Sequence, residues 1–259
     1  MIVPGISGYF DDSGKIHDQP SLVIGGFIGR KEQWAQLWSD WEKVLSDNGL
    51  SYFHGVDCEH GNEEFDKETK DKWKDPQARS DCRMEFVDAI VRAGLTGFVS
   101  GVVSANYKAL DGQQRKRIGK PFSLAAQTLV VIVKDWANER HVYDLFPYMF
   151  EAGSEGYGEF SEVFNKAMAH EIRRGWYRMK ALVGKECIPA QAADLIAYEY
   201  SHCMNGVAQS SDTGFRRPAV RELNDKLVVR ARYHNTTTLA EVLSQPKSEY
   251  LPFKVPRRK

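Results

Sequence analysis

The chain predicts an α/β fold, in which a mixed sheet starts antiparallel, continues with parallel crossovers and carries helices on its faces. Two strand-like segments, residues 6–10 and 21–29, come first and are close enough in sequence to form a hairpin. After them, strand-like and helical segments alternate, as crossover connections between parallel strands require. The 259 residues show no repeat, no low-complexity stretch and no clear linker, so we expect one domain.

Each expected element follows from the spacing of its apolar residues. Alternating or β-branched runs indicate strands, and apolar positions at helical spacing indicate helices. The strands are expected at 6–10, 21–29, 95–105, 145–151 and 177–183. The helices are expected at 32–45, 82–93, 122–137, 160–172, 189–204, 219–227 and 239–243. Asn48-Gly49 should end the first helix, and Pro189 lies in the first turn of a later one.

We expect one domain, residues 1–259, in which two stretches do not belong to the alternating strands and helices of the core. Residues 30–94, which follow the second strand, are expected to be an insertion within it. Their segment from 58 to 80 is the most polar part of the chain and is expected to be a mobile surface excursion or a short helix. Residues 206–259 are expected to form a C-terminal helical extension with a basic tail.

Composition argues against several classes of protein. Lys plus Arg and Asp plus Glu both number 35, so the net charge is zero and nucleic acid binding needs a local patch. No run approaches the roughly 20 apolar residues of a membrane span, and no basic segment precedes the first apolar run as in a signal peptide. The cysteines lack CxxC spacing and are expected as reduced thiols of a cytoplasmic protein: Cys58, Cys82, Cys187 and Cys203.

Two acids end the first strand, in Tyr9-Phe10-Asp11-Asp12-Ser13-Gly14. A strand that ends this way holds acidic groups at the rim of a sheet, where a divalent cation can bind them. Because side chains alternate along a strand, Asp11 and Asp12 should point to opposite faces, and Asp11 is the favoured ligand. A turn that starts at Asp12 would bring the second carboxylate in as well. The same residues also form ordinary turns, in which Asp and Ser cap the local backbone.

Two more acids lie at element ends far along the chain. Glu151 ends the apolar run Tyr148-Met149-Phe150, and open α/β sheets bind ligands outside the carboxyl ends of their strands. Asp194 lies in the first turns of an apolar helix, where an unpaired buried charge would be very costly. Each acid alone would serve as a helix cap or a helix-dipole partner. Together with Asp11, they indicate a carboxylate site.

Such a site suits Mg²⁺ or Mn²⁺, which prefer oxygen ligands and keep several waters. Three or four carboxylates that bridge two ions roughly 3.5 to 4 Å apart can activate a water for phosphodiester cleavage. In Phe53-His54-Gly55-Val56-Asp57-Cys58-Glu59, a further ligand or proton-transfer group could come from His54, Asp57 or Glu59. The other interpretation of this segment is a polar loop. Glu199, on the helix of Asp194, is a weaker ligand candidate.

Basic residues gather in three places, at 115–120, 173–180 and 257–259. Trp176 and Tyr177 interleave the second cluster, so that it could hold phosphates and stack bases. Ordinary solvated surface is the other interpretation of all three clusters. A nucleic acid partner is therefore expected only through local patches.

The residues singled out above also carry a resemblance to a known family. The opening Tyr-Phe-Asp-Asp-Ser-Gly, the Phe-His-Gly-Val-Asp segment, the Phe-Glu-Ala-Gly-Ser strand end and the Gln-Ala-Ala-Asp-Leu-Ile-Ala-Tyr helix resemble domain-of-unknown-function family 3800. That family is grouped with the ribonuclease H-like superfamily. The resemblance spans about residues 5 to 205. The family has Asp-Glu-Ser-Gly at the start, whereas this chain has the shorter Asp12 as its second acid.

The resemblance implies a ribonuclease H-like fold, with a five-stranded mixed sheet flanked by helices and interrupted here by the insertion. It also implies an acid on the first strand, one that ends the fourth strand and one on the last core helix: Asp11, Glu151 and Asp194. The acid expected on the first crossover helix has no clear match. Asp135, late in the 122–137 helix, and the insertion's Asp57 or Glu59 are the alternatives.

These inferences predict a Mg²⁺- or Mn²⁺-dependent nuclease in which Asp11 bridges the metals and Glu151 and Asp194 complete the ligands, with help from His54 or Asp57. One alternative is a catalytically silent domain that binds nucleic acid or a protein partner in a mobile-element or phage-defence system. Another uses the Asp-Ser-Gly turn to hold nucleotide phosphates, as sugar kinases and actin-like ATPases do. That use calls for a second glycine-rich turn, for which Glu155-Gly156-Tyr157-Gly158 is a weak candidate.

Overall fold

The computed structural model describes residues 5–13, 19–142, 146–151, 158, 161–163, 165, 177–182, 186–208 and 217–245, with only the backbone at 146, 151, 177–182, 207 and 208. The strands are β1 Ile6–Ser13, β2 Ser21–Arg30, β3 Thr96–Val103, β4 Phe146–Glu151, β5 Tyr177–Leu182 and β6 Val229–His234. The α-helices are α1 Lys31–Asn48, α2 Gly55–His60, α3 Pro76–Ala93, α4 Ser104–Lys108, α5 Gly112–Ile118, α6 Pro121–Glu139, α9 Ile188–Ala208, α10 Pro218–Lys226 and α11 Thr236–Ser244. Two short 3₁₀ helices are η1 Glu63–Phe65 and η2 Asp71–Lys74.

One mixed sheet joins the strands in the order β5-β4-β1-β2-β3-β6. β1, β2 and β3 pair antiparallel, whereas β4 runs parallel to β1 and β5, and β6 runs parallel to β3. The predicted mixed sheet flanked by helices is confirmed, with a strand at each of the five expected places. β6 was not predicted, because an edge strand with the sequence Val-Arg-Ala-Arg-Tyr-His carries a weak apolar signal. The expected helical extension, 206–259, therefore contributes a strand as well.

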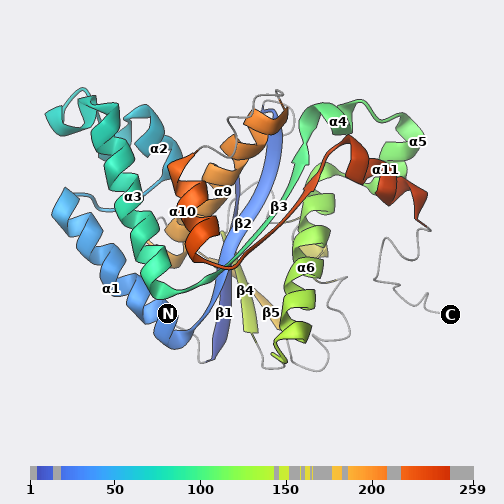
Figure 1. Cartoon of the computed structure of the whole chain (residues 1–259), viewed down its shortest axis with the longest axis horizontal. Helices are drawn as coiled ribbons and strands as arrows, with labels where there is room; N and C mark the ends of the chain where they lie inside the picture. Colours follow the sequence, from blue (N-terminus) through green and yellow to red (C-terminus); the bar gives the residue numbers. More distant parts are fainter. Residues whose placement is uncertain are drawn as a thin grey trace.

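Helices cover both faces of the sheet (Figure 1). On one face, α6 packs in a core that includes Phe10 and Ile24. On the other face, α1, α3 and α9 pack in a core that includes Tyr9 and Val23. Tyr9 and Phe10 thus belong to opposite faces, as the alternation of side chains along a strand predicts.

α9 lies directly on β2 at one point. A Cβ atom added at Gly25 would be 2.9 Å from Ala197 Cα, so the close approach of helix to strand depends on a glycine. In the sheet register, Gly25 pairs with Asp11 of β1. This packing places the middle of α9 over the strand pair that contains Asp11, the first of the candidate acids.

Helix ends follow signals that are visible in the sequence. α1 stops where Asn48-Gly49 predicts, because Gly49 adopts a left-handed conformation with φ 65°. α3 begins at Pro76, and the Asp75 side chain caps it by accepting a hydrogen bond from the Gln77 backbone N–H at 2.8 Å. Local chemistry therefore fixes the boundaries of both long helices of the insertion.

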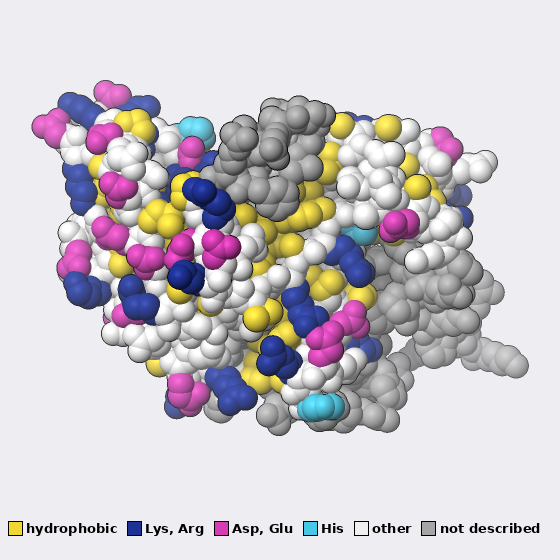
Figure 2. Space-filling model, in the orientation of Figure 1, with side chains coloured by type: hydrophobic (Ala, Val, Ile, Leu, Met, Phe, Trp, Pro, Cys, Tyr) yellow, Lys and Arg dark blue, Asp and Glu magenta, His cyan; other side chains and the backbone are white. Residues whose placement is uncertain are grey.

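The insertion packs as a helical layer that is polar outside and aromatic inside. Acidic and basic side chains mix on the surface of its helices, at the left of the space-filling view (Figure 2). The stretch from 58 to 80, expected to be a mobile excursion or a short helix, contains the end of α2, the two 3₁₀ helices and the start of α3. It buries Phe65 and Trp73 almost completely, with their rings 5.0 Å apart. These two aromatic rings anchor a segment whose composition suggested exposure.

Some expectations fall on residues that the structure does not describe. These are the turn at Gly14-Lys15, most of the 160–172 helix, the glycine-rich segment at 155–157, and the basic residues 173–176 and 257–259. Among the helices described, none combines the length and the apolar content that crossing a lipid bilayer requires.

Candidate functional site

Asp11 lies near the end of β1, on the sheet face that α9 covers. The residue is 8% exposed, and its Oδ1 accepts a hydrogen bond from the Asp12 backbone N–H at 2.8 Å. Asp12 pairs instead with Ile24, which belongs to the core on the α6 side. Because β1 continues through Ser13, no turn at Asp12 rotates its side chain toward Asp11. This backbone therefore favours Asp11 over Asp12, and a role for Asp12 as a second metal ligand remains a prediction.

Glu151 is the last residue of β4, the parallel neighbour of β1. The register pairs Tyr9 with Met149 and Phe10 with Phe150. The next residues along the two strands are Asp11 and Glu151, so their backbones lie side by side at the carboxyl ends of two parallel strands. The side chain of Glu151 lies outside the described part of the structure.

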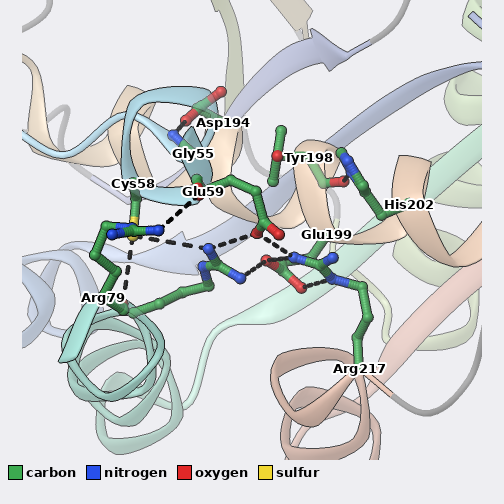
Figure 3. Close-up of polar contacts among 10 residues, drawn as sticks. Gly55, Cys58, Glu59, Arg79, Asp194, Tyr198, Glu199, His202 and Arg217 are labelled. Atoms are coloured by element: carbon green, nitrogen blue, oxygen red, sulfur yellow. Dashed lines mark hydrogen bonds and ion pairs between the residues drawn. The ribbon is translucent and has the colours of Figure 1, made fainter. Parts of the chain in front are cut away.

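Asp194 lies on α9, about one helical turn before Ala197, the residue that packs on Gly25. Its Oδ2 accepts a hydrogen bond from the Gly55 backbone N–H at 2.7 Å (Figure 3). The half-buried carboxylate is therefore hydrogen-bonded, as the cost of burying a charge requires. α9 thus brings Asp194 to the sheet face of Asp11, about one helical turn from the level of that acid.

The segment that begins at Phe53 docks on α9 through three positions of that helix. Gln191 Oε1 accepts hydrogen bonds from the Phe53 backbone N–H at 2.9 Å and from Trp41 Nε1 at 2.8 Å. Asp194 holds Gly55, and a Cβ atom added at Gly55 would be 2.8 Å from the Tyr198 ring. These α9 positions are three and four residues apart, so they share one face of the helix.

Sequence reasoning gave no role to the two residues that flank Asp194 in this docking, Gln191 and Tyr198. Their signal is the helical spacing within Gln-Ala-Ala-Asp-Leu-Ile-Ala-Tyr, which places a polar group and a ring on the face of the acid. Finding them from that spacing would have required knowing that the Phe53 segment was their partner.

His54 and Asp57 form a hydrogen-bonded pair next to Asp194. His54 Nδ1 lies 2.8 Å from Asp57 Oδ2, and the His54 side chain is 38% exposed while that of Asp57 is 11% exposed. The pair flanks Gly55, whose N–H bonds Asp194. Both residues that were expected to assist therefore lie beside Asp194.

Two glutamates and two arginines form a group around one buried carboxylate, which we call the Glu199 cluster: Glu59, Arg83, Glu199 and Arg217 (Figure 3). Glu199 is 1% exposed, with its oxygens 2.6 Å from Arg217 Nε and 3.3 Å from Arg83 Nη1. Glu59 Oε2 lies 2.6 Å from Arg83 Nη2 and 3.0 Å from Arg217 Nη2. Each carboxylate contacts both guanidinium groups, so the buried charges balance.

This pairing changes the interpretation of two acids. Glu59 and Glu199 were candidate metal ligands, but their oxygens already face two arginines, whose positive charge opposes a cation at the same place. We therefore remove both from the candidate ligand set. What the cluster does instead is join α2, α3 and α9 to the residue that precedes α10.

Glu59 makes the stability of the protein depend on pH. Burial opposes its ionisation, but Arg83 and Arg217 outweigh burial and lower its pKa from 4.5 to about 2. A carboxyl with a lower pKa in the native state contributes stability above its unfolded pKa and loses it as the pH falls toward the native value. We expect the urea midpoint of the wild type to fall more steeply than that of Glu59→Gln between about pH 5 and pH 2.5. Parallel curves would contradict this assignment.

Asp135 does not supply a missing ligand. It is exposed on α6, which packs on the opposite face of the sheet from α9. Asp57, from the insertion, is the alternative that lies near Asp194, through the pair it forms with His54. The insertion, rather than the α6 crossover, is therefore the source of additional acidic groups at this site.

Among the described side chains, which do not include that of Glu151, no group of three His, Cys, Asp or Glu residues is placed to hold a metal ion. Asp11 and Asp194 are present, but a complete set needs the Glu151 carboxylate. The cysteines are free thiols, and burial raises the pKa of Cys58 to about 11, which disfavours the thiolate that a zinc site needs.

No protein-family model matches the sequence, and no curated protein matches it significantly. The site must therefore be interpreted from its own residues. They are an acid near the end of β1, the backbone of a second acid beside it, and a third acid on α9 next to a His–Asp pair.

Proposed function

We propose that the chain is a ribonuclease H-like nuclease that hydrolyses phosphodiester bonds with Mg²⁺ or Mn²⁺. The supporting observation is the register of β1 and β4, which makes Asp11 and Glu151 neighbours at the carboxyl ends of parallel strands. Acidic side chains at that position can share cations, because ligands of open α/β sheets bind there. Asp194 on α9 adds a third acid from the helix that covers this face.

The chain's residues divide the work in this proposal. Bound divalent ions would activate a water and stabilise the charge that develops on the leaving oxygen. Asp11 would bridge the ions, and Glu151 and Asp194 would complete the carboxylate set. The Gly55 N–H fixes the orientation of Asp194, because it donates to one of the two carboxylate oxygens.

His54 is the proton-transfer group in this proposal. Its imidazole is partly exposed, and histidine can both accept and donate a proton near neutral pH. Asp57 acts as a positioning residue, because its carboxylate contacts Nδ1 and so determines which ring nitrogen faces the site. The docking of the Phe53 segment on Gln191 and Tyr198 holds this pair beside Asp194.

The test is a cleavage assay on end-labelled single- and double-stranded DNA, single-stranded RNA and an RNA–DNA hybrid. With Mn²⁺ or Mg²⁺, we expect at least one substrate to be cut, and EDTA to stop the reaction. Mn²⁺ should also raise the melting temperature, because a ligand that binds the native state stabilises it. A wild-type protein that neither cuts nor is stabilised by Mn²⁺ would reject the proposal and favour a silent binding domain.

A further inference from the structure

A cavity of about 410 Å³ lies at the end of the sheet opposite the candidate site. Its walls come from the start of β1, the end of β2, the start of β3 and the last turn of α6: Ile6, Arg30, Thr96 and Trp136. Its volume is within the range of about 300–1,000 Å³ that small-molecule sites occupy. The nuclease proposal assigns nothing to this cavity.

Half of the described residues that line the cavity have large apolar side chains. Ile6, Ile28 and Trp136 are buried residues of the core on the α6 side, and Val142 packs against the same core. Val228, which also lines the cavity, is 49% exposed, although large apolar side chains in the described structure are rarely so open. In Figure 2, hydrophobic side chains lie between basic ones in the lower centre of the face, next to the lower end of α6. A ligand here would cover apolar surface that water now contacts.

Among the described residues that line the cavity, the two charged ones are both arginines. Arg30 comes from the end of β2 and Arg140 from the end of α6. Neither arginine forms an ion pair with any residue that the structure describes. Gln33, the other strongly polar group, already bonds the Arg30 backbone N–H and the Gly94 carbonyl.

The acid next to Arg140 interacts with it electrostatically but forms its ion pair with another arginine. Glu139, next to Arg140 in sequence, pairs with both terminal nitrogens of Arg230, with one of the two contacts at 3.1 Å. Guanidinium groups bind carboxylates and phosphates through paired hydrogen bonds, which makes arginine well suited to anions of both kinds. Two arginines that form no ion pair within the described structure, beside apolar side chains, therefore fit a ligand that has a charged end and an apolar body.

We propose that this cavity binds a small amphipathic organic anion. Arg30 and Arg140 hold its carboxylate or phosphate, and its apolar body lies on Trp136, Ile6 and Ile28. The site is independent of the acids near the end of β1, since it lies at the other end of the sheet. Its failure would leave the nuclease proposal intact.

Isothermal titration with four probes tests the site: octanoate, octyl phosphate, 1-octanol and inorganic phosphate. We expect octanoate or octyl phosphate to bind, and the preferred one identifies the anionic group. 1-Octanol, without the charge, and inorganic phosphate, without the apolar body, should each bind at least about tenfold more weakly. Three results would overturn the proposal. The alcohol could bind as tightly as its anionic counterparts, inorganic phosphate could bind as tightly as octyl phosphate, or neither amphipathic anion could bind.

Variants locate the site. Arg140→Gln should weaken binding of the preferred anion about tenfold, because one paired charge contact is lost. Arg232→Gln is the matched control: it removes an exposed arginine of β6 that does not line the cavity, so affinity should stay within about twofold. Val228→Phe, at an exposed position, should narrow the cavity and weaken binding without unfolding the protein. Unchanged affinity in both Arg140→Gln and Val228→Phe would place the probe elsewhere and refute the assignment.

Discussion

Replacing Asp11 with Asn will abolish metal-dependent cleavage and leave the fold intact. The amide has nearly the shape of the carboxylate but lacks the negative charge that would bridge two cations. Loss of a residue that hydrogen-bonds a metal ligand typically costs about 10–100-fold in activity or metal affinity. Loss of the ligand itself should therefore cost more. Initial cleavage rates with Mn²⁺ measure the loss of activity, and the Mn²⁺-induced shift in melting temperature measures the loss of metal binding.

Asp12→Asn is the matched control for that experiment. It makes the same chemical change one residue later, on the strand position that pairs with Ile24 of the opposite core. We expect it to keep most of the cleavage activity and most of the Mn²⁺ stabilisation. Equal loss in both variants would show that the two carboxylates act together, and would contradict the separation of Asp11 and Asp12 onto different faces. Full activity in Asp11→Asn would reject the proposed metal site itself.

Replacing Glu199 with Gln will destabilise the protein more than any other single loss of charge considered above. Glu199 is 1% exposed and contacts two arginines, so the amide leaves positive charge buried with only Glu59 to balance it. Removing one partner of a buried ion pair typically costs about 3–5 kcal/mol. Urea denaturation should therefore show a free energy of unfolding lower by about 3 kcal/mol, with little change in the slope.

An exposed pair on the same protein provides the control. Glu139 pairs with Arg230, and the Glu139 side chain is 56% exposed. Glu139→Gln should change the free energy of unfolding far less than Glu199→Gln does, because solvent screens an exposed ion pair. Similar losses in the two glutamine variants would mean that the Glu199 cluster is more hydrated than its geometry indicates.

The Glu199 cluster also matters for the proposed chemistry. It ties α2 to α3 and α9, and α2 begins next to His54 and carries Asp57. If it loosens in Glu199→Gln, the His54–Asp57 pair should lose its fixed place beside Asp194. We therefore expect the variant, assayed well below its melting temperature, to retain Mn²⁺ binding better than it retains cleavage.

The sequence predicted most elements of the fold because their signals are local. Apolar spacing identified the five strands and the long helices, and Asn48-Gly49 identified the end of α1. β6 was not predicted because an edge strand buries few side chains, and its arginines obscure the alternation of apolar and polar residues. Phe65 and Trp73 escaped because an average over a polar stretch conceals two aromatic residues that anchor it.

In the candidate site, too, some features follow from local spacing and others depend on tertiary packing. The separation of Asp11 from Asp12 onto two faces follows from the period of a strand, and the His54–Asp57 pair follows from a spacing of three residues. The partners of Glu59 and Glu199 do not follow from any spacing. Arg217 is eighteen residues from Glu199, and it meets that acid only because α10 packs on α9 and α3.

By itself, the sequence determined which residues carry charge, which face of a strand or helix each occupies, and where an element ends at a clear local signal such as Asn48-Gly49. These properties depend on backbone geometry within a few residues. Only the tertiary structure decided that β4 pairs with β1 so that Asp11 and Glu151 become neighbours, and that two arginines neutralise Glu59 and Glu199. Strand register and ion pairing depend on how segments that are distant in sequence pack together. That packing depends on how the whole chain buries its apolar side chains.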